Sequence, residues 1–390
     1  MKISDFFSLA RRNAPQEAKQ YVPPLISYQF AAMPAWSTRN FASLVRSGYL
    51  RNPVVYRCVR LISEAVAAAP WIIEGGSKAD GDHPALRLLA KPNVRQTGAA
   101  FLEALVGYHL LAGTVFVELV SLDAQPRELH ILRPDRVKLL HDKHGWLQGY
   151  TYQVGATTIE KSIPADAPAP LVEMKQFHPL EDHAGFSPLE AAQTSTDMHN
   201  QSAHWNKSLL DNSARPSGAL IYQPSDGMPL NAQQYDRLKQ ELEAEFSGPG
   251  RAGRPMLLEG GLDWRAMSLT PKDMDFRQSR DNAAREIALC FGVPPQLLGI
   301  PGDSTYANYA EANRAFIKQT ILPLLRRMAQ TFSTWLGAHY QDGTTLSHDF
   351  DAVEGNAADR DALWARIAAA DFLTEQEKRA AVGYGPKHDG

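Results

Sequence analysis

The segment CFGVPPQLLGIPGDSTYANYAEA, residues 290–312, most constrains how this chain can fold, because it combines three prolines with three glycines. Proline restricts the backbone, whereas glycine permits turns that other residues avoid. The segment joins two long helical patterns, one over residues 272–291 and one over residues 305–340. The sequence therefore predicts a stiff loop, residues 293–304, between two long helices.

The helical pattern over residues 272–291 carries charges of alternating sign at i,i+4 spacing. Its members are Asp273, Arg277, Asp281 and Arg285. Opposite charges at this spacing form a continuous ladder along one helix face. Two interpretations remain open, a face in contact with solvent or a face that pairs with a neighbouring subunit.

The helical pattern over residues 305–340 is apolar on one face and contains Pro323 near its middle. Proline has no backbone donor, and its ring clashes with the carbonyl four residues earlier, here that of Gln319. We therefore expect this helix to kink at Pro323.

Residues 187–212 also have a helical pattern, with few large apolar residues and many Gln, Ser, Asn and His. A long helix this polar is not expected in a core, so it packs against copies of itself or bridges two bodies. Residues 213–270 follow as a small α/β insert. They comprise a strand at 218–222, a helix capped by Asn231, a strand at 254–260 and a strand-like run at 264–269.

Residues 40–186 are predicted to form one α+β domain. Asn52-Pro53 and Thr97 are typical helix starts, and the run at 71–74 favours a strand. After Gly113 the apolar period changes to two, in runs at residues 114–120, 127–133, 136–141 and 145–154. Turn clusters between these runs favour an antiparallel meander. In the tail, residues 359–370 and 374–382 favour two short helices.

Charge and hydropathy exclude several classes of protein. The 390 residues include 40 basic and 43 acidic side chains, for a net charge of −3, so nucleic-acid contacts should be local or weak. The longest uncharged apolar stretch, residues 104–117, is too short to cross a bilayer. Residues 1–39 lack a secretory signal pattern, and we expect a loose arm on a soluble protein. Cys58 and Cys290 lie in apolar helical patterns and are expected to pack as small hydrophobes.

The sequence offers no candidate catalytic, cofactor-binding or metal-binding set, so we expect no enzyme. GPGRAG, residues 248–253, matches G-x-G-x-x-G, but it follows a helix and enters a strand, the reverse of a dinucleotide site. Residues 347–356 contain three acidic side chains in a turn-forming setting, which favours a surface turn over a metal site. His199 and His204 do not share a helix face and are expected at the polar surface.

Several segments carry a family resemblance through their order along the chain. They are NPVVYRCVRLISEAVAAAPW, HPALRLLAKPN, LLAGTVFVEL, LHILRPDRV, GFSPLEAA, FGVPPQLLG and LTEQEKRAAVGYGP, between residues 52 and 386. Together they resemble the portal proteins of tailed bacteriophages and of the related gene transfer agents. One departure is Asp371, where the resemblance leads us to expect a small turn residue such as glycine.

The resemblance implies an α+β, portal-like subunit. Its regions would be an N-terminal arm (1–39), a wing (40–186), two stem helices (187–212 and 272–291), a clip (213–270), a tunnel loop (293–304), a kinked tunnel helix (305–340) and a C-terminal crown region (341–390). The residues implied to line a DNA tunnel are Gln296, Leu297, Leu298, Ile300, Asp303 and Ser304. The alternative for this loop is that it packs as a corner of the core.

The resemblance also implies a ring, a dodecamer, at one capsid vertex, through which double-stranded DNA is packaged and released and to which the tail attaches. Implied partners are that DNA, a packaging ATPase (terminase), a head–tail adaptor protein and the major capsid protein, with no membrane. Such a virion or phage-like particle would be assembled in the bacterial cytoplasm. Two other functions remain open: another structural head or adaptor protein without a tunnel, and a nucleotide-binding enzyme that uses residues 248–253.

Overall fold

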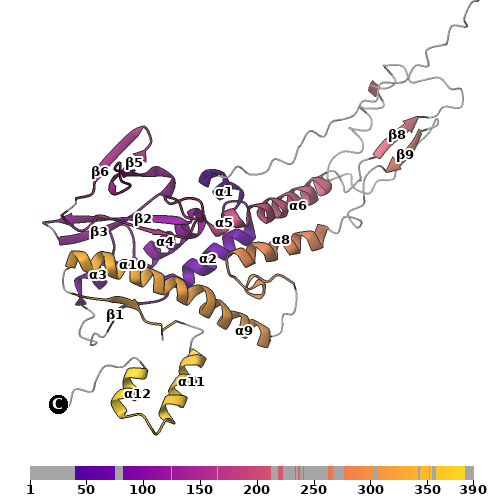
Figure 1. Cartoon of the computed structure of the whole chain (residues 1–390). Helices are drawn as coiled ribbons and strands as arrows, with labels where there is room; N and C mark the ends of the chain where they lie inside the picture. The colour runs from indigo at the N-terminus through magenta and orange to yellow at the C-terminus, as the bar shows by residue number, and fades with distance from the viewer. Residues whose placement is uncertain are drawn as a thin grey trace, which may run out of the picture. The chain divides into compact units, whose positions relative to one another are not determined.

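The computed structural model describes residues 40–74, 82–123, 125–164, 166–211, 218–222, 233, 236–237, 240, 262–266, 276–301, 306–340, 343–350, 352–353 and 357–382. Helices and strands alternate in an α+β arrangement, as predicted (Figure 1). The helices are α1 (Phe41–Ser47), α2 (Pro53–Ala67), α3 (Pro84–Ala90), α4 (Gly98–Ala112), α5 (Pro188–Ala191), α6 (Gln193–Asp211), α8 (Phe276–Cys290), α9 (Tyr306–Phe316), α10 (Leu322–Tyr340), α11 (Ala357–Ala368) and α12 (Glu375–Ala381). The strands are β1 (Trp71–Ile73), β2 (Thr114–Leu122), β3 (Gln125–Leu132), β4 (Val137–His141), β5 (Leu147–Val154), β6 (Thr157–Ser162), β7 (Leu171–Lys175), β8 (Gly218–Tyr222), β9 (Leu262–Ala266) and β10 (Leu346–His348).

Local capping signals determine where the central helices begin and end. The Asn52 side chain accepts hydrogen bonds from the backbone N–H groups two and three residues later, and Pro53 occupies the first position of α2. The Thr97 hydroxyl caps α4 in the same way, and Gly113 ends that helix with a φ of 72°. These positions are the ones that the capping residues predict.

One apolar core joins parts of the chain that lie far apart in the sequence. Helix α2 packs against both α4 and α8, and α10 packs against β10. Ile62 of α2, Leu105 of α4, Ile287 of α8 and Leu325 of α10 are all completely buried. Burying one such side chain stabilises the fold by about 2 kcal/mol. Helices α8 and α10 therefore share one hydrophobic core with the predicted wing.

The predicted meander over residues 114–154 is wrong in its topology. The strands form two separate three-stranded antiparallel sheets, β3-β2-β7 and β4-β5-β6. The first half of β2 is buried, so its backbone needs a hydrogen-bonded neighbour on both edges, and β7 supplies the second one. A 3₁₀ turn, Pro134–Arg136, separates β3 from β4. Strand β6 was not predicted, because it is exposed along its whole length and has no apolar alternation.

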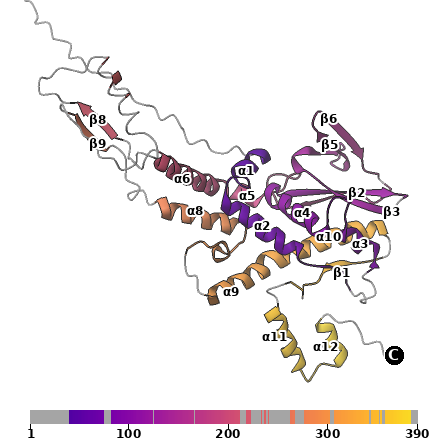
Figure 2. The same ribbon diagram turned by 180° about the vertical axis from the view of Figure 1, so that it is seen from behind.

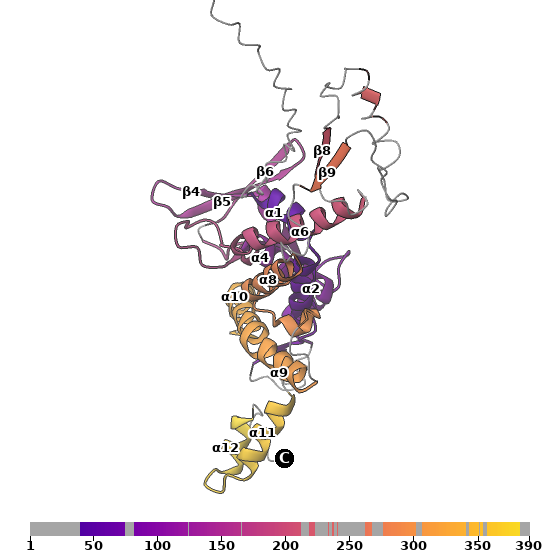
Figure 3. The same ribbon diagram turned by 90° about the vertical axis from the view of Figure 1, so that its right-hand side faces the viewer.

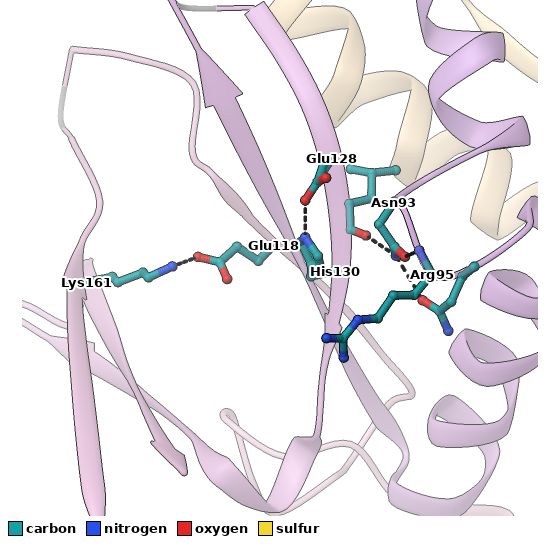
Figure 4. A network of polar contacts seen from close by, with 8 residues as sticks. Asn93, Arg95, Glu118, Glu128, His130 and Lys161 are labelled. Atoms are coloured by element: carbon teal, nitrogen blue, oxygen red, sulfur yellow. Dashed lines mark hydrogen bonds and ion pairs between the residues drawn. The ribbon is translucent and has the colours of Figure 1, made fainter.

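A polar contact joins the two sheets. Glu118 of β2 accepts a hydrogen bond from the Tyr150 hydroxyl of β5, at 2.7 Å. It also accepts one from Nζ of Lys161 on β6 (Figure 4). Burial, with the hydrogen bond and charge of Glu118, raises the pKa of Tyr150, so the phenol remains a donor. Nearby, Nδ2 of Asn93 donates to the Leu129 carbonyl at 3.0 Å and ties the chain before α4 to β3.

The predicted helix over residues 187–212 is interrupted near its start. Helix α5 begins after the N-cap Ser187, and α6 resumes at Gln193 after Ala192, whose φ of −85° and ψ of 5° depart from helical values. Helices α6 and α8 lie side by side in Figure 1 and Figure 2, and they contact each other. His199 of α6 was expected at the surface, but it is only 3% exposed, because α1 and α2 cover that side of the helix.

Two further local predictions are overturned. Residues 346–348 overlap the expected surface turn, yet they form β10, which pairs antiparallel with β1. His348 is buried there and its ring stacks on that of Trp71, with centroids 3.8 Å apart. Cys290 is exposed, because it occupies the last turn of α8, whereas Cys58 is buried as predicted.

The remaining described elements belong to the insert and the tail. Strand β8 is confirmed, and β9 pairs antiparallel with it over residues 262–266, slightly earlier than the predicted run. The predicted strand at 254–260 and most of the helix after Asn231 lie outside the described residues. Helices α11 and α12 confirm the two predicted tail helices, and Thr374 forms a capping box with Glu377. Within the described ranges, no helix is both long and apolar enough to span a bilayer.

Candidate functional site

Helices α6 and α8, which we call the stem pair, lead into the predicted tunnel loop. Small buried side chains of α8, Ala283, Ala284 and Ala288, allow neighbouring helices to approach closely. The Ser195 hydroxyl of α6 donates a hydrogen bond to the carboxylate of Glu286 on α8. Large apolar side chains nevertheless remain on the outside of the pair, with Leu289 79% exposed and Trp205 41% exposed.

The predicted charge ladder is only partly described. Asp273 and the side chain of Arg277 lie outside the described residues. Asp281 is half-buried and Arg285 is exposed. One guanidinium nitrogen of Arg285 donates to the backbone carbonyl of Pro301, so this side chain reaches from α8 to the far end of the predicted tunnel loop.

The loop begins with a glycine-dependent helix end. Gly292 has a φ of 67°, its N–H donates to the Leu289 carbonyl at 3.0 Å, and the N–H of Val293 donates to the Ala288 carbonyl at 2.9 Å. This pair of bonds is the Schellman arrangement, which satisfies carbonyls left free at a helix C-terminus. The Thr320 hydroxyl donates to the Gly292 carbonyl at 2.6 Å, which ties the start of the loop to the following helical region.

A second tight turn follows at once. Residues Pro295–Leu298 form a 3₁₀ turn that ends at Gly299, which has a φ of 69°. The N–H of Gly299 donates to the Gln296 carbonyl and that of Ile300 to the Pro295 carbonyl, both at 3.3 Å. Prolines and left-handed glycines thus give this segment a defined path, as the sequence predicts for a stiff loop.

The structure brings four of the six predicted tunnel residues together on this turn. Gln296, Leu297, Leu298 and Ile300 are all half-buried. Leu297 and Leu298 pack against the main hydrophobic core, so these two side chains also serve as the corner that was the alternative interpretation. Asp303 and Ser304 lie outside the described residues.

The helix after the loop contains an irregular turn just before Pro323. Helix α9 ends at Phe316, residues Ile317–Ile321 form a π-helical turn, and α10 begins at Leu322 (Figure 3). The N–H of Leu322 donates to the Ile317 carbonyl, five residues earlier. A π turn widens the backbone, so it relieves the clash between a proline ring and the carbonyl four residues before it.

Sequence reasoning missed the contacts that hold the loop in place. Thr320 was not singled out, because a hydroxyl on the exposed side of a helix has no local signal for a partner 28 residues away. The same holds for the bond from Arg285 to Pro301, since Arg285 was assigned only to the i,i+4 ladder. Gly292 was recognisable, because glycine after a helical pattern is the usual C-terminal signal.

The described residues hold no cluster of three or more His, Cys, Asp or Glu side chains placed to bind a metal ion. The glycine-rich segment 248–253 lies outside the described residues, as do Asp351 and Glu354 of the acidic turn. The described features near the loop are a helix end, two tight turns, a π turn and the hydrogen bonds that connect them.

Comparison with known proteins agrees with this arrangement. The family model described as "Phage portal protein" matches residues 53–383. The chain is 42% identical to a protein of Rickettsia bellii (strain RML369-C) over 88% of this chain and 89% of the relative. It is 24% identical to the portal protein of Enterobacteria phage HK97 over 87% of this chain and 80% of that protein.

A solved structure supplies the oligomeric context. The chain superposes with a TM-score of 0.70 and 47% identity on a chain from the neck of a native gene transfer agent particle computed with C12 symmetry. The match covers 90% of this chain and 96% of that one. The family match, which includes the stem pair, the loop and α10, extends over most of the sequence. This chain therefore belongs to the phage portal protein family, whose members form the channel of the head–tail connection.

Proposed function

We propose that twelve copies of this protein form a closed ring at one capsid vertex, and that double-stranded DNA passes through the ring during packaging and release. The observation that carries this proposal is the likeness, over 90% of the chain, to the neck of a particle with C12 symmetry. A ring needs a heterologous contact, in which one surface of a subunit meets a different surface of the next.

Exposed apolar side chains support such contacts. Leu289 on the stem pair is 79% exposed, and elsewhere Phe177 and Leu180, in the segment between β7 and α5, are 85% and 87% exposed. That segment is anchored, because the N–H of Gln176 donates to the Gly113 carbonyl at 2.8 Å. Large apolar residues that are held in fixed positions at a surface are typical of interaction sites.

In this ring, residues 293–304 form the tunnel loop. Its proposed DNA-facing residues are Gln296, Leu297, Leu298, Ile300, Asp303 and Ser304. Because Leu297 and Leu298 also contact the core, they define the shape of the turn that presents its neighbours. A loop with few positive charges suits transport, since each basic phosphate contact adds salt-sensitive affinity that slows sliding.

The remaining predicted residues direct or hold neighbouring segments of the subunit. Pro323 and the π turn before it direct the helix that follows the loop. Of the ladder residues, Asp273, Arg277 and Asp281 contribute to contacts along the stem, and Arg285 holds the loop through Pro301. The clip around β8 and β9 is the proposed docking site of the packaging ATPase.

The protein acts in this proposal as a conduit and assembly hub without catalysis of its own. Its other partners are the head–tail adaptor and the major capsid protein. The ring is assembled in the bacterial cytoplasm and then remains in the virion or gene transfer agent particle. The support is the family match and the likeness to a particle neck.

Electron microscopy and native mass spectrometry of the purified protein test the proposal. We expect rings of twelve subunits with a central hole. Monomers at capsid-assembly concentrations, or closed assemblies without a hole, would favour a structural head or adaptor protein instead. Calorimetry with ATP tests the enzyme alternative, for which heat of binding would be the supporting result.

A further inference from the structure

A basic cavity of about 430 Å³ lies where α2, α6 and α8 meet. Arg51 and Pro53 line it from the start of α2, and Arg280 lines it from α8. The α6 residues that line it are His199, Asn200, Gln201, Ala203 and His204. The lining therefore contains two guanidinium groups and two imidazoles but no carboxylate.

A buried amide, that of Asn52, is hydrogen-bonded to two of the lining residues, His199 and Asn200. The Oδ1 of Asn52 accepts from the backbone N–H groups of Val54 and Val55, at 3.0 and 3.2 Å, so the orientation of this amide is determined. Its Nδ2 must then be the donor to Nδ1 of His199, at 3.2 Å, and to Oδ1 of Asn200, at 3.0 Å. Asn52 itself is 1% exposed.

This network determines the tautomer of His199. Because Nδ1 accepts from Asn52, the ring proton of the neutral imidazole is on Nε2. Burial, together with the charge of Arg280, lowers the pKa of His199 and keeps the ring neutral, although Asp281 acts in the opposite direction. The residue is 3% exposed and lines the cavity. No acceptor among the described residues bonds to its Nε2–H, and this nitrogen is not one of the enclosed polar atoms, so a ligand or water in the cavity can accept from it.

The charges around the cavity are also without partners. Arg51, Arg280 and His204 are exposed, and within the described part of the chain none of them forms an ion pair. The N–H groups at the start of α2 already bond to Asn52, so this helix contributes only its favourable dipole for an anion. The two non-bridging oxygens of a phosphodiester project from a tetrahedral centre, and each can accept from more than one donor, so one such group can contact both guanidinium groups and the imidazole N–H.

We propose that this cavity binds a phosphate group, and, building on the proposed function, that the group belongs to the backbone of DNA. Its volume accommodates a phosphodiester with adjoining sugar atoms. Arg51 and Arg280 neutralise the charge, and His199 donates from Nε2 to one phosphate oxygen. Because the whole chain has a net charge of −3, this is a local contact, and one phosphate per subunit adds only a shallow salt dependence that still permits DNA to slide.

Fluorescence anisotropy of a short labelled duplex, measured on full-length rings over a series of NaCl concentrations, tests the proposal. We expect Arg280→Gln and Arg51→Gln each to weaken binding about tenfold. Each should also lower the slope of log affinity against log salt by about 1. Arg280→Lys should retain part of the affinity. Arg366→Gln removes an exposed arginine of α11 and is the matched control, with unchanged binding expected.

Inorganic phosphate and acetate serve as competitors, and native mass spectrometry reports ring formation for every variant. Competition by phosphate but not acetate supports the site. If phosphate binding falls in the arginine variants while duplex binding does not, the group bound is a free phosphate and the DNA source is overturned. If the arginine variants bind inorganic phosphate and the duplex as well as wild type does, the site is overturned. If they bind both normally but no longer form rings, the site is also overturned and the arginines belong to a contact between subunits. Wild-type protein that forms no ring would instead contradict the proposed function.

Discussion

The hydroxyl of Thr320 donates a hydrogen bond of 2.6 Å to the carbonyl of Gly292, and so connects the π turn before Pro323 to the start of the proposed tunnel loop. The contact joins the end of α8 to the helix on the other side of the loop. This bond therefore connects the helix near Pro323 to the first turn of the loop.

Thr320→Val should loosen this connection. The substitution keeps the shape of the side chain but leaves the Gly292 carbonyl without its donor, so we expect a loss of about 1 kcal/mol in unfolding free energy. Thr331→Val is the control, since that hydroxyl bonds only within its own helix, to the Arg327 carbonyl. Urea denaturation measures both variants. Equal stability of Thr320→Val and wild type would contradict an anchoring role.

Gly292→Ala should destabilise the protein more than Gly299→Ala. Both glycines have positive φ, which costs an alanine about 1–2 kcal/mol. A Cβ at Gly292 would also lie 2.8 Å from Oγ1 of Thr320, whereas a Cβ at Gly299 meets no atom within 4 Å. The thermal midpoints of the two variants test this order. A reversed order would show that the Thr320 side chain moves away from the added Cβ at little cost.

Pro323→Ala should lower the fraction of closed rings without lowering the stability of the subunit. Alanine supplies a backbone N–H that can bond to the Gln319 carbonyl, so the π turn can relax to regular helix and the direction of α10 changes. Gln330→Ala, an exposed position on α10, is the control. Native mass spectrometry gives the fraction of subunits in rings. Rings as abundant as in wild type would show that ring closure does not depend on the direction that Pro323 gives to α10.

Single serine substitutions separate the two roles of the loop. Leu297→Ser and Leu298→Ser should each cost about 1 kcal/mol of stability, because both side chains pack against the core. Ile300→Ser should have a smaller effect on stability but lower the amount of nuclease-protected DNA per particle. Normal DNA content in the Ile300→Ser particles, with a sharply lowered melting temperature of the ring, would assign that residue to the core as well.

Stability should fall as the pH is lowered from 7 to 5, because of two buried histidines. Burial lowers the pKa of His109 and of His348 from 6.5 to about 4. The unfolded chain therefore binds protons between these values and the folded chain does not, so stability is complete above about pH 6.5 and is lost toward pH 4. The full shift corresponds to roughly 3 kcal/mol for each group.

Urea unfolding at pH 7 and pH 5 measures this dependence. His348→Phe retains the ring that stacks on Trp71 but does not titrate, so its stability should depend less on pH than that of wild type. An unchanged difference between the two pH values in this variant would show that His348 is not among the groups responsible.

The local features of this protein were determined by the sequence alone. Asn52-Pro53, Thr97 and Ser187 start helices where they were expected, because a capping side chain reaches only two or three residues along its own chain. Gly292 and Gly299 turn the backbone where proline cannot, and the α+β character follows from the change in apolar period after Gly113. The order of the family segments was likewise sufficient to indicate a portal protein.

Only the tertiary structure determined the features that depend on contacts between segments far apart in the chain. Strand β2 pairs with β7 and not only with its sequence neighbour, since a buried strand needs partners on both edges and the pattern of one strand does not specify which. His199 is buried because α1 and α2 cover it, and Leu297 and Leu298 are half-buried because the loop folds back on the core. Thr320 bonds to Gly292 only after α9 and α8 have been brought together. Capping and turn preferences act over a few bonds, whereas these contacts arise from apolar burial between segments far apart in the chain.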